Sequence, residues 1–312
     1  MADYQKIIAA RPEVGEFIRA RRAIRYRGEA MSYAPNLKCD SFSTDGSGFR
    51  HSVLRGESLS VAESRRSRRY GLVLGASNSF GFGLAGNENT MSSLLGERFG
   101  FPFANVSMPG ANSRNLHSLL MAFLSGIRPA VVVHSSGGDL STFCESSLAD
   151  PVFGSPNRAQ LKTVVKQASQ RANAEADLPK FLAFTTLWTS AIVNLCRAHA
   201  IPIVLVQQGT FFEKRNPSRL EQHFRLGEPI LSSHARQFEN HKKFNQPFSA
   251  ARKSVSDRLG IPLAGVGLSE SLTFIDEFHC DYDGTRLLTN AVGDVIEPMI
   301  QLKETRSTLR VG

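Results

Sequence analysis

Short, mostly apolar runs of strand length recur along this chain, and they constrain its fold more than any other feature. They cover residues 70–74, 130–134 and 201–206, and apolar residues at helical spacing occur between and after them. A strand that is apolar on both faces must be covered on both faces, as in the parallel sheets of α/β proteins. The sequence therefore predicts a three-layer α/β fold with a mostly parallel sheet and helices on both faces.

Small and polar residues follow these strands where each one ends. Ser77 comes directly after the first run, Gly110 lies in a Pro-Gly turn after a strand-like stretch near residue 105, and Gly138 and Asp139 follow the run 130–134. The carboxyl ends of parallel strands meet at one edge of an open sheet, and ligands bind there. We therefore expect these segments to converge on one site.

A second motif, far along the chain, contains the partners that a nucleophilic serine needs. A serine hydroxyl is a weak nucleophile unless a histidine accepts its proton and a carboxylate orients that histidine. Asp276 and His279 lie three residues apart and can serve both purposes. Each motif alone has an ordinary explanation, because Gly- and Ser-rich turns are common and aspartate often caps a helix. Their order and spacing together favour a serine hydrolase.

The combined motifs resemble those of the SGNH hydrolase superfamily, also called GDSL-like esterases and lipases, over roughly residues 69–300. The resemblance implies an SGNH or flavodoxin-like sheet. It also implies that Ser77 is the nucleophile, that His279 is the base and that Asp276 orients it. The backbone N–H groups of Ser77 and Gly110 would then bind the oxyanion of the transition state.

Two positions depart from the family's pattern. Ala76 stands where an aspartate usually precedes the serine, a change that leaves the proton acceptor intact. Gly138 stands where an asparagine usually completes the oxyanion hole, and losing one such donor costs about 2.7–4 kcal/mol of transition-state stabilisation. The backbone N–H of Gly138 or Gly137, Asn78 and Asn112 are candidates to replace that donor, and the sequence does not choose among them. If the hole merely lacks a donor, an asparagine at residue 138 should raise kcat; if another group fills the role, it should lower kcat.

The activity implied is hydrolysis of an acyl or acetyl oxygen ester on a carbohydrate-containing substrate, whether a small molecule or a glycan. We expect Asn78, Asn112 and Asp139 to contact that substrate. Two alternatives stay open. An O-acyltransferase would use the same scaffold with a sugar hydroxyl in place of water, and a catalytically degenerate binding or assembly protein of polysaccharide biosynthesis is favoured by Gly138.

Composition narrows the choice of partners. No His, Cys, Asp or Glu spacing indicates a metal site, and the motifs imply no cofactor. The net charge is +9, but no recognised nucleic-acid motif accompanies it, so we expect no nucleic-acid partner. A solvated face, or attraction for an acidic glycan, substrate or membrane surface, explains the charge better. Much of it comes from two arginine clusters: Arg19, Arg21, Arg22, Arg25 and Arg27, and Arg65, Arg66, Arg68 and Arg69.

The pattern divides the chain into three parts. Residues 1–68 form a helical and irregular extension, 69–302 the hydrolase domain and 303–312 a tail. The turn at 45–50 is similar to the entry segment of SGNH-like proteins encoded with bacterial surface-polysaccharide pathways. Helical spacing continues over 157–200 and 230–259, and the charged segment 209–229 is the candidate for a substrate lid.

The sequence also bears on location. No uninterrupted apolar run reaches the length of a membrane-spanning helix, and the first residues are polar and lack the apolar region of a signal peptide. We therefore expect a cytoplasmic protein without a membrane span. The oligomeric state is left open.

Overall fold

A five-stranded sheet forms the centre of the protein, with strands in the order β6-β5-β7-β8-β9. The computed structural model describes residues 8, 11–27, 30–135, 138–140, 174–217, 221, 232–276 and 278–308. All neighbouring strands of this sheet pair in parallel, so the predicted parallel sheet is confirmed. The strands are β5 (Gly71–Gly75), β6 (Phe103–Asn105), β7 (Val131–Ser135), β8 (Ile203–Val206) and β9 (Leu263–Ala264).

Successive residues of the central strands pack into two different cores. Leu72 and Leu74 of β5 belong to the core on one side of the sheet, and Val73 belongs to the core on the other. The residues of β7 and β8 divide in the same way. Because successive side chains of a strand point to opposite faces, a strand that serves two cores must be apolar throughout. This is the physical reason for the apolar runs in the sequence.

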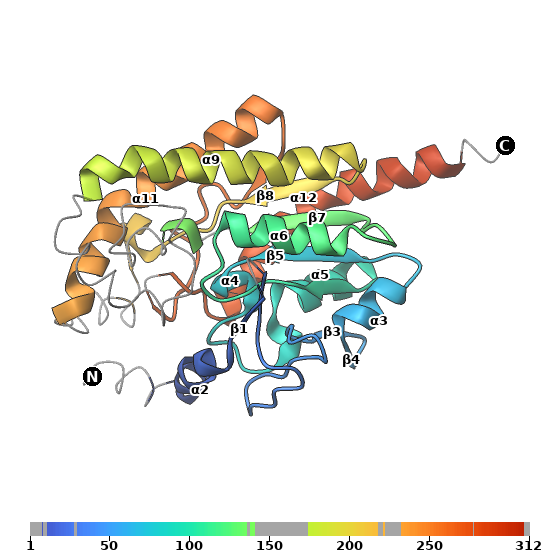
Figure 1. Ribbon diagram of the computed structural model, residues 1–312, viewed down its shortest axis with the longest axis horizontal. Helices are drawn as coiled ribbons and strands as arrows, with labels where there is room; N and C mark the ends of the chain where they lie inside the picture. Colours follow the sequence, from blue (N-terminus) through green and yellow to red (C-terminus); the bar gives the residue numbers. More distant parts are fainter. Residues whose placement is uncertain are drawn as a thin grey trace.

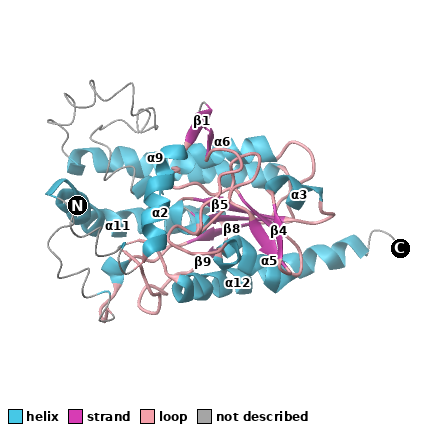
Figure 2. Ribbon diagram, turned by 90° about the horizontal axis from the view of Figure 1, so that it is seen from below, coloured by secondary structure: helices cyan, strands magenta, loops and turns pink. Residues whose placement is uncertain are grey.

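Helices cover both faces of the sheet and complete the three predicted layers (Figure 2). On one face lie α6 (Ser113–Phe123), α9 (Ala174–Ala198) and α11 (Ser232–Leu259), and on the other lie α5 (Met91–Phe99) and α12 (Tyr282–Thr308). The helix α12 runs past residue 302, so the expected start of the tail falls inside a helix. Residues 157–173 and 230–231, which the sequence predicts to be helical, lie outside the described residues.

One segment of α9, Leu178–Ala198, is long and apolar enough by length and composition to cross a membrane. In the structure α9 packs against α6 and α11, and Ile192, Val193 and Cys196 belong to the core beside the sheet. A core helix of a soluble protein meets the same criterion. Length and composition therefore do not make α9 a membrane helix.

The N-terminal segment, blue in Figure 1, packs directly against the part of the chain that contains the five-stranded sheet. The ring of Phe17 stacks on that of Phe42 at 4.5 Å, and Tyr33 lies 5.2 Å from Phe80. Phe80 belongs to α4 (Ser77–Phe80), the short helix that follows β5. The extension thus shares one core with the sheet. Its elements are α2 (Pro12–Ala20), η1 (Arg21–Ala23), β1 (Arg25–Arg27), β2 (Ala30–Ser32), β3 (Ser52–Leu54), β4 (Glu57–Leu59) and α3 (Val61–Arg66).

Arg50 is the largest fully buried side chain of the described residues. Its guanidinium donates to the carbonyl oxygens of Gly81 at 2.7 Å, Leu84 at 2.9 Å and Gly86 at 2.8 Å. Burial lowers the pKa of Arg50 to about 9, so the group stays charged at neutral pH. Arg50 therefore supplies the hydrogen bonds of a loop that has no regular structure and that directly follows α4. The sequence drew attention to the turn at 45–50 but gave Arg50 no such role.

We expect Arg50→Met to lower the free energy of unfolding by at least about 3 kcal/mol, because several buried carbonyl groups lose their donor and each unsatisfied group costs roughly 1–3 kcal/mol. Urea denaturation followed by circular dichroism measures this. The matched control is Arg68→Met, which removes the same charge from an exposed position. Equal stability of the two variants would contradict the account.

Candidate functional site

Ser77, His279 and Asp276 lie in one hydrogen-bonded line at the carboxyl end of the sheet. Ser77 is the first residue of α4, and its Oγ lies 2.7 Å from Nε2 of His279. On the other side of the ring, Nδ1 of His279 lies 2.6 Å from Oδ2 of Asp276. With the proton on Nδ1 donated to the carboxylate, Nε2 is free to accept the proton of the serine hydroxyl. The structure thus brings the three residues together in the order that a nucleophilic serine requires.

The turn that carries His279 is fixed by Asp276 itself. Oδ1 of Asp276 accepts hydrogen bonds from the backbone N–H groups of Phe278 at 2.9 Å and His279 at 2.8 Å. Burial alone would raise the pKa of the Asp276 carboxyl, but the electrostatic interaction with His279 and the hydrogen bonds that the carboxyl accepts outweigh it and lower that pKa. Asp276 therefore stays ionised beside the imidazole and holds both its ring and its backbone.

Asn78 connects the same turn to α4, the helix that begins at Ser77. Its Nδ2 donates to the carbonyl oxygen of Phe278 at 3.0 Å, and its Oδ1 accepts from the N–H of Cys280 at 3.1 Å. The ring of Phe82 packs 4.4 Å from the imidazole of His279. Asn78 is buried, and its amide is occupied on both sides. These contacts hold the turn that carries His279 against α4, and the substrate contact expected of Asn78 stays a prediction.

The sequence names the backbone N–H groups of Ser77 and Gly110 for the oxyanion hole. Ser77 begins α4, so its N–H has no acceptor within the helix. The turn at Gly110 follows β6 and is held beside the end of β5 by the hydrogen bond from Met108 N–H to the carbonyl of Gly75, at 2.9 Å. Gly110 has a φ of +80° and is exposed, a conformation that favours glycine. Both groups therefore remain the candidates that the sequence named.

Gly138 has no room for any side chain. A Cβ atom there would lie 1.8 Å from the carbonyl oxygen of Ala111 and 3.3 Å from the Cβ of Ala76. The glycine allows the backbone after β7 to pack against the turn at 110–112 and against the residue before the nucleophile. An asparagine cannot occupy this position without moving that turn. Gly137, the neighbouring candidate donor, lies outside the described residues.

Asn112 and Asp139 are engaged with the start of α6. Asn112 caps this helix, and its Oδ1 accepts from the N–H of Asn115 at 3.0 Å. Asp139 accepts from the N–H of Ser113 at 2.8 Å and also from its hydroxyl, and burial raises the pKa of the Asp139 carboxyl. Asp139 lines the cleft beside Ser77, whereas Asn112 does not. Both were expected to contact substrate, and that expectation stays a prediction beside these structural hydrogen bonds.

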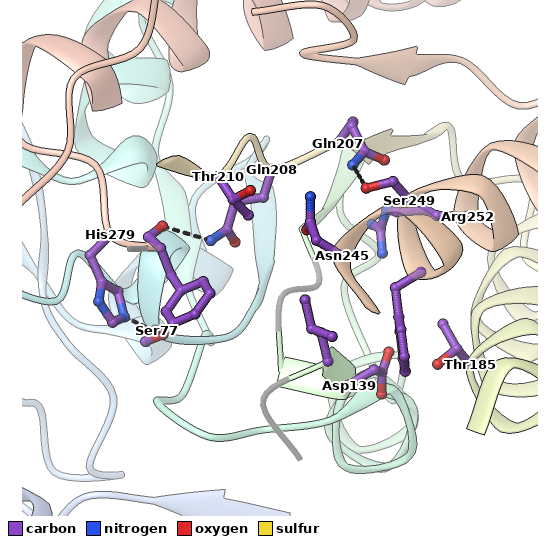
Figure 3. Close-up of a pocket in the computed structure, with 13 residues that line it drawn as sticks. Ser77, Asp139, Thr185, Gln207, Gln208, Thr210, Asn245, Ser249, Arg252 and His279 are labelled. Carbon is purple, nitrogen blue, oxygen red and sulfur yellow. Dashed lines mark hydrogen bonds between the residues drawn. The ribbon is translucent and has the colours of Figure 1, made fainter. Parts of the chain in front are cut away.

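A cleft of about 640 Å³, counted with its open mouth, extends from the triad. Figure 3 shows Ser77 and His279 at one end and Arg252, Asp139 and Thr185 toward the other. Four of its polar side chains have buried atoms without a hydrogen-bond partner among the described residues. These are Thr185 on α9, Gln207 and Thr210 after β8, and Arg252 on α11. Of the expected lid, 209–229, only residues 209–217 and 221 are described, and Thr210 alone lines the cleft.

Sequence reasoning did not find the part of the cleft that α11 lines. The lining residues of α11 are Asn245, Phe248, Ser249 and Arg252, in a helix whose polar composition looks solvated. Their recurrence at intervals of three and four residues places them on one face, which is the signal that could have found them. Within the described residues, no group of His, Cys, Asp and Glu side chains that could hold a metal is found.

No family model matches the sequence, and no curated protein matches it. Solved structures similar to this chain include a carbohydrate acetylesterase family member from Sinorhizobium meliloti, with a TM-score of 0.48, 16% identity and coverage of 75% of this chain and 99% of the other. A psychrotrophic esterase from Pseudoalteromonas sp. has a TM-score of 0.45 and 15% identity, and the match covers 75% of this chain and 99% of the esterase. A lipase/acylhydrolase from Enterococcus faecalis has a TM-score of 0.45 and 13% identity, and the match covers 74% of this chain and 96% of that protein. The chemistry proposed below rests on the site of this chain.

The sequence left open whether an asparagine at residue 138 raises or lowers kcat, and the packing at Gly138 favours a lower kcat. We expect Gly138→Asn and Gly138→Ala both to lower esterase activity and the melting temperature, because even a methyl group displaces the turn that carries Gly110. Hydrolysis of p-nitrophenyl acetate and a thermal melt measure the two effects. Gly96→Ala is the control, since a Cβ there meets only ordinary contacts, the nearest at 3.5 Å. A rise in kcat for Gly138→Asn would show that the hole lacked a donor and had room for one.

The two hydrogen bonds between Asn78 and the turn that carries His279 give a second prediction. We expect Asn78→Ala to lower kcat by about tenfold to a hundredfold, since a catalytic group misplaced by about 1 Å can cost that much, with little change in KM. Steady-state kinetics with p-nitrophenyl acetate measures both constants. Asn89→Ala is the control, because Asn89 bonds only the carbonyl of Ala85 in a nearby loop. A raised KM with unchanged kcat would instead support the substrate contact expected from the sequence.

Proposed function

We propose that this protein is an SGNH-type serine hydrolase that cleaves an acyl or acetyl oxygen ester on a carbohydrate-containing substrate. The observation that carries the proposal is the pair of short hydrogen bonds on either side of the His279 ring, 2.7 Å to Ser77 and 2.6 Å to Asp276. A half-buried ionised carboxylate, an imidazole and a serine at a strand-to-helix turn have together the roles of base orienter, base and nucleophile.

The reaction would proceed through an acyl-enzyme. Oγ of Ser77 bonds to the carbonyl carbon of the ester while its proton moves to Nε2 of His279. The N–H groups of Ser77 and Gly110 stabilise the negative oxygen of the tetrahedral intermediate. His279 then gives the proton to the departing alcohol oxygen. Water attacks the acyl group in turn, loses its proton to His279, and the acid is released as Ser77 recovers its hydrogen.

The polar character of the cleft supports a substrate rich in hydroxyl groups. Oγ1 of Thr185, Oε1 of Gln207 and Oγ1 of Thr210 are buried without a partner among the described residues. A buried polar group without a hydrogen bond costs roughly 1–3 kcal/mol. Sugar hydroxyls could donate to all three oxygens and could also accept from the two threonine hydroxyls. A purely aliphatic acyl chain would leave these groups unsatisfied.

The two alternatives remain testable. An acyltransferase would differ only in the acceptor, so product analysis with and without a sugar acceptor separates it from a hydrolase. The degenerate binding protein was favoured by Gly138. The intact hydrogen bonds of the triad favour an enzyme, because a site without catalysis has no need for them.

We expect Ser77→Ala and His279→Ala to lower kcat for p-nitrophenyl acetate by about 10⁴-fold or more, and Asp276→Asn by roughly 10⁴-fold, because the three groups act as a unit. Release of p-nitrophenol and of acetate from acetylated sugars measures the activity. Ser79→Ala is the matched control two residues away, and we expect it to remain active. Silence of the wild-type protein toward a broad panel of acyl esters would overturn the proposal.

A further inference from the structure

Arg252 is a buried cation in the wall of the cleft, and two of its three nitrogens have no hydrogen-bond partner among the residues that the structure describes. Its side chain is 4% exposed, and one nitrogen, Nη2, donates to the carbonyl oxygen of His134. Nε and Nη1 have no hydrogen-bond partner among the described residues. A guanidinium is always charged and has only donors, so within the described part of the chain these two nitrogens lack an acceptor, in a side chain that lines the cleft.

The neighbouring groups do not supply that acceptor. Asp139 is the acidic side chain that lines the same cleft, but its two oxygens accept from Ser113, and no ion pair joins it to Arg252 among the described residues. Burial and the charge of Arg252 lower the pKa of His134 well below its ordinary value, so that ring is neutral. Burial lowers the pKa of Arg252 itself to about 10, which leaves it charged at neutral pH.

A carboxylate fits these unused donors better than a hydroxyl group does. The planar fork of a guanidinium matches a carboxylate in two parallel, charge-assisted hydrogen bonds, whereas a hydroxyl accepts from one donor and brings no charge. The polar side chains around Arg252 suit the hydroxyl groups of such a ligand. Ser249 and Asn245 lie nearby on α11, and Gln207 follows β8 (Figure 3).

We propose that Arg252 is an anion subsite of the cleft and that the natural substrate has a carboxylate, on its acyl part or on its sugar part. This inference rests on the proposed ester hydrolysis for its kinetic test. The inference narrows the class of substrate. In place of a neutral acylated carbohydrate, we expect either an acylated acidic carbohydrate or a carbohydrate half-ester of a dicarboxylic acid. In either case the carboxylate binds Nε and Nη1 of Arg252 while the ester carbonyl lies at Ser77.

Two matched pairs of substrates distinguish these sources. The first pair is mono-p-nitrophenyl glutarate and p-nitrophenyl valerate, which differ by a carboxylate on the acyl chain. The second is a mono-O-acetylated methyl glucuronoside and the corresponding glucoside, which differ by a carboxylate on the sugar. We expect the wild-type protein to prefer the acidic member of one pair by roughly tenfold or more in kcat/KM.

The ratio within a pair is the readout, because it is insensitive to a general loss of activity. In Arg252→Met the preference should disappear or invert, and in Arg252→Lys it should survive in part. Arg258→Met removes the same charge from an exposed position on α11 and should keep the wild-type ratio. Hydrolysis without preference in either pair, or a preference that survives in a folded Arg252→Met, overturns the subsite and leaves the proposed function intact.

A binding measurement separates this inference from the failure of catalysis. Calorimetric titration of Ser77→Ala with methyl glucuronoside and with glutarate should give a heat of binding for one of them. The neutral methyl glucoside should bind at least tenfold more weakly, and Arg252→Met should remove the difference. If no ester is hydrolysed but this binding is seen, the anion subsite is supported and the proposed ester hydrolysis is overturned. If neither acid binds more tightly than the glucoside, the subsite is overturned.

Discussion

The hydrogen bond between Ser77 and His279 is the contact on which the rest of the structure depends. It joins residues 202 positions apart, and several independent interactions hold its two ends. The sheet sets the position of Ser77 at the end of β5, and Arg50 fixes the loop that follows α4. Asn78 connects the nucleophile helix to the turn that carries His279. Placement of the triad is therefore a property of the whole fold, including the N-terminal segment.

The central sheet and the triad could be predicted from the sequence because their signals are local. A strand between two cores must be apolar throughout, and the residues at its carboxyl end lie at the site whatever the helices do. The triad was accessible because a nucleophilic serine needs particular partners in a particular order. The role of Asp276 in closing its own turn also follows from the chemistry of an aspartate side chain next to free N–H groups.

The remaining features depend on contacts that a local pattern does not contain. Gly138 looked like a missing donor, and only the carbonyl of Ala111 explains why no side chain fits there. Asn78 is a polar residue beside the nucleophile, and its partners lie about 200 residues away. Arg252 belongs to a helix whose polar sequence suggests exposure to solvent. The packing of α11 against the sheet nevertheless buries this side chain. In each case the deciding neighbour comes from a distant part of the chain.

The central claim is that Ser77 is a nucleophile activated by His279, and covalent labelling tests it most directly. The account predicts that a fluorophosphonate forms one adduct, found by mass spectrometry on the peptide that contains Ser77. The adduct should be absent in Ser77→Ala, strongly slowed in His279→Ala and retained in Ser79→Ala. An adduct on Ser79, or no adduct on a folded wild-type protein, would contradict the account.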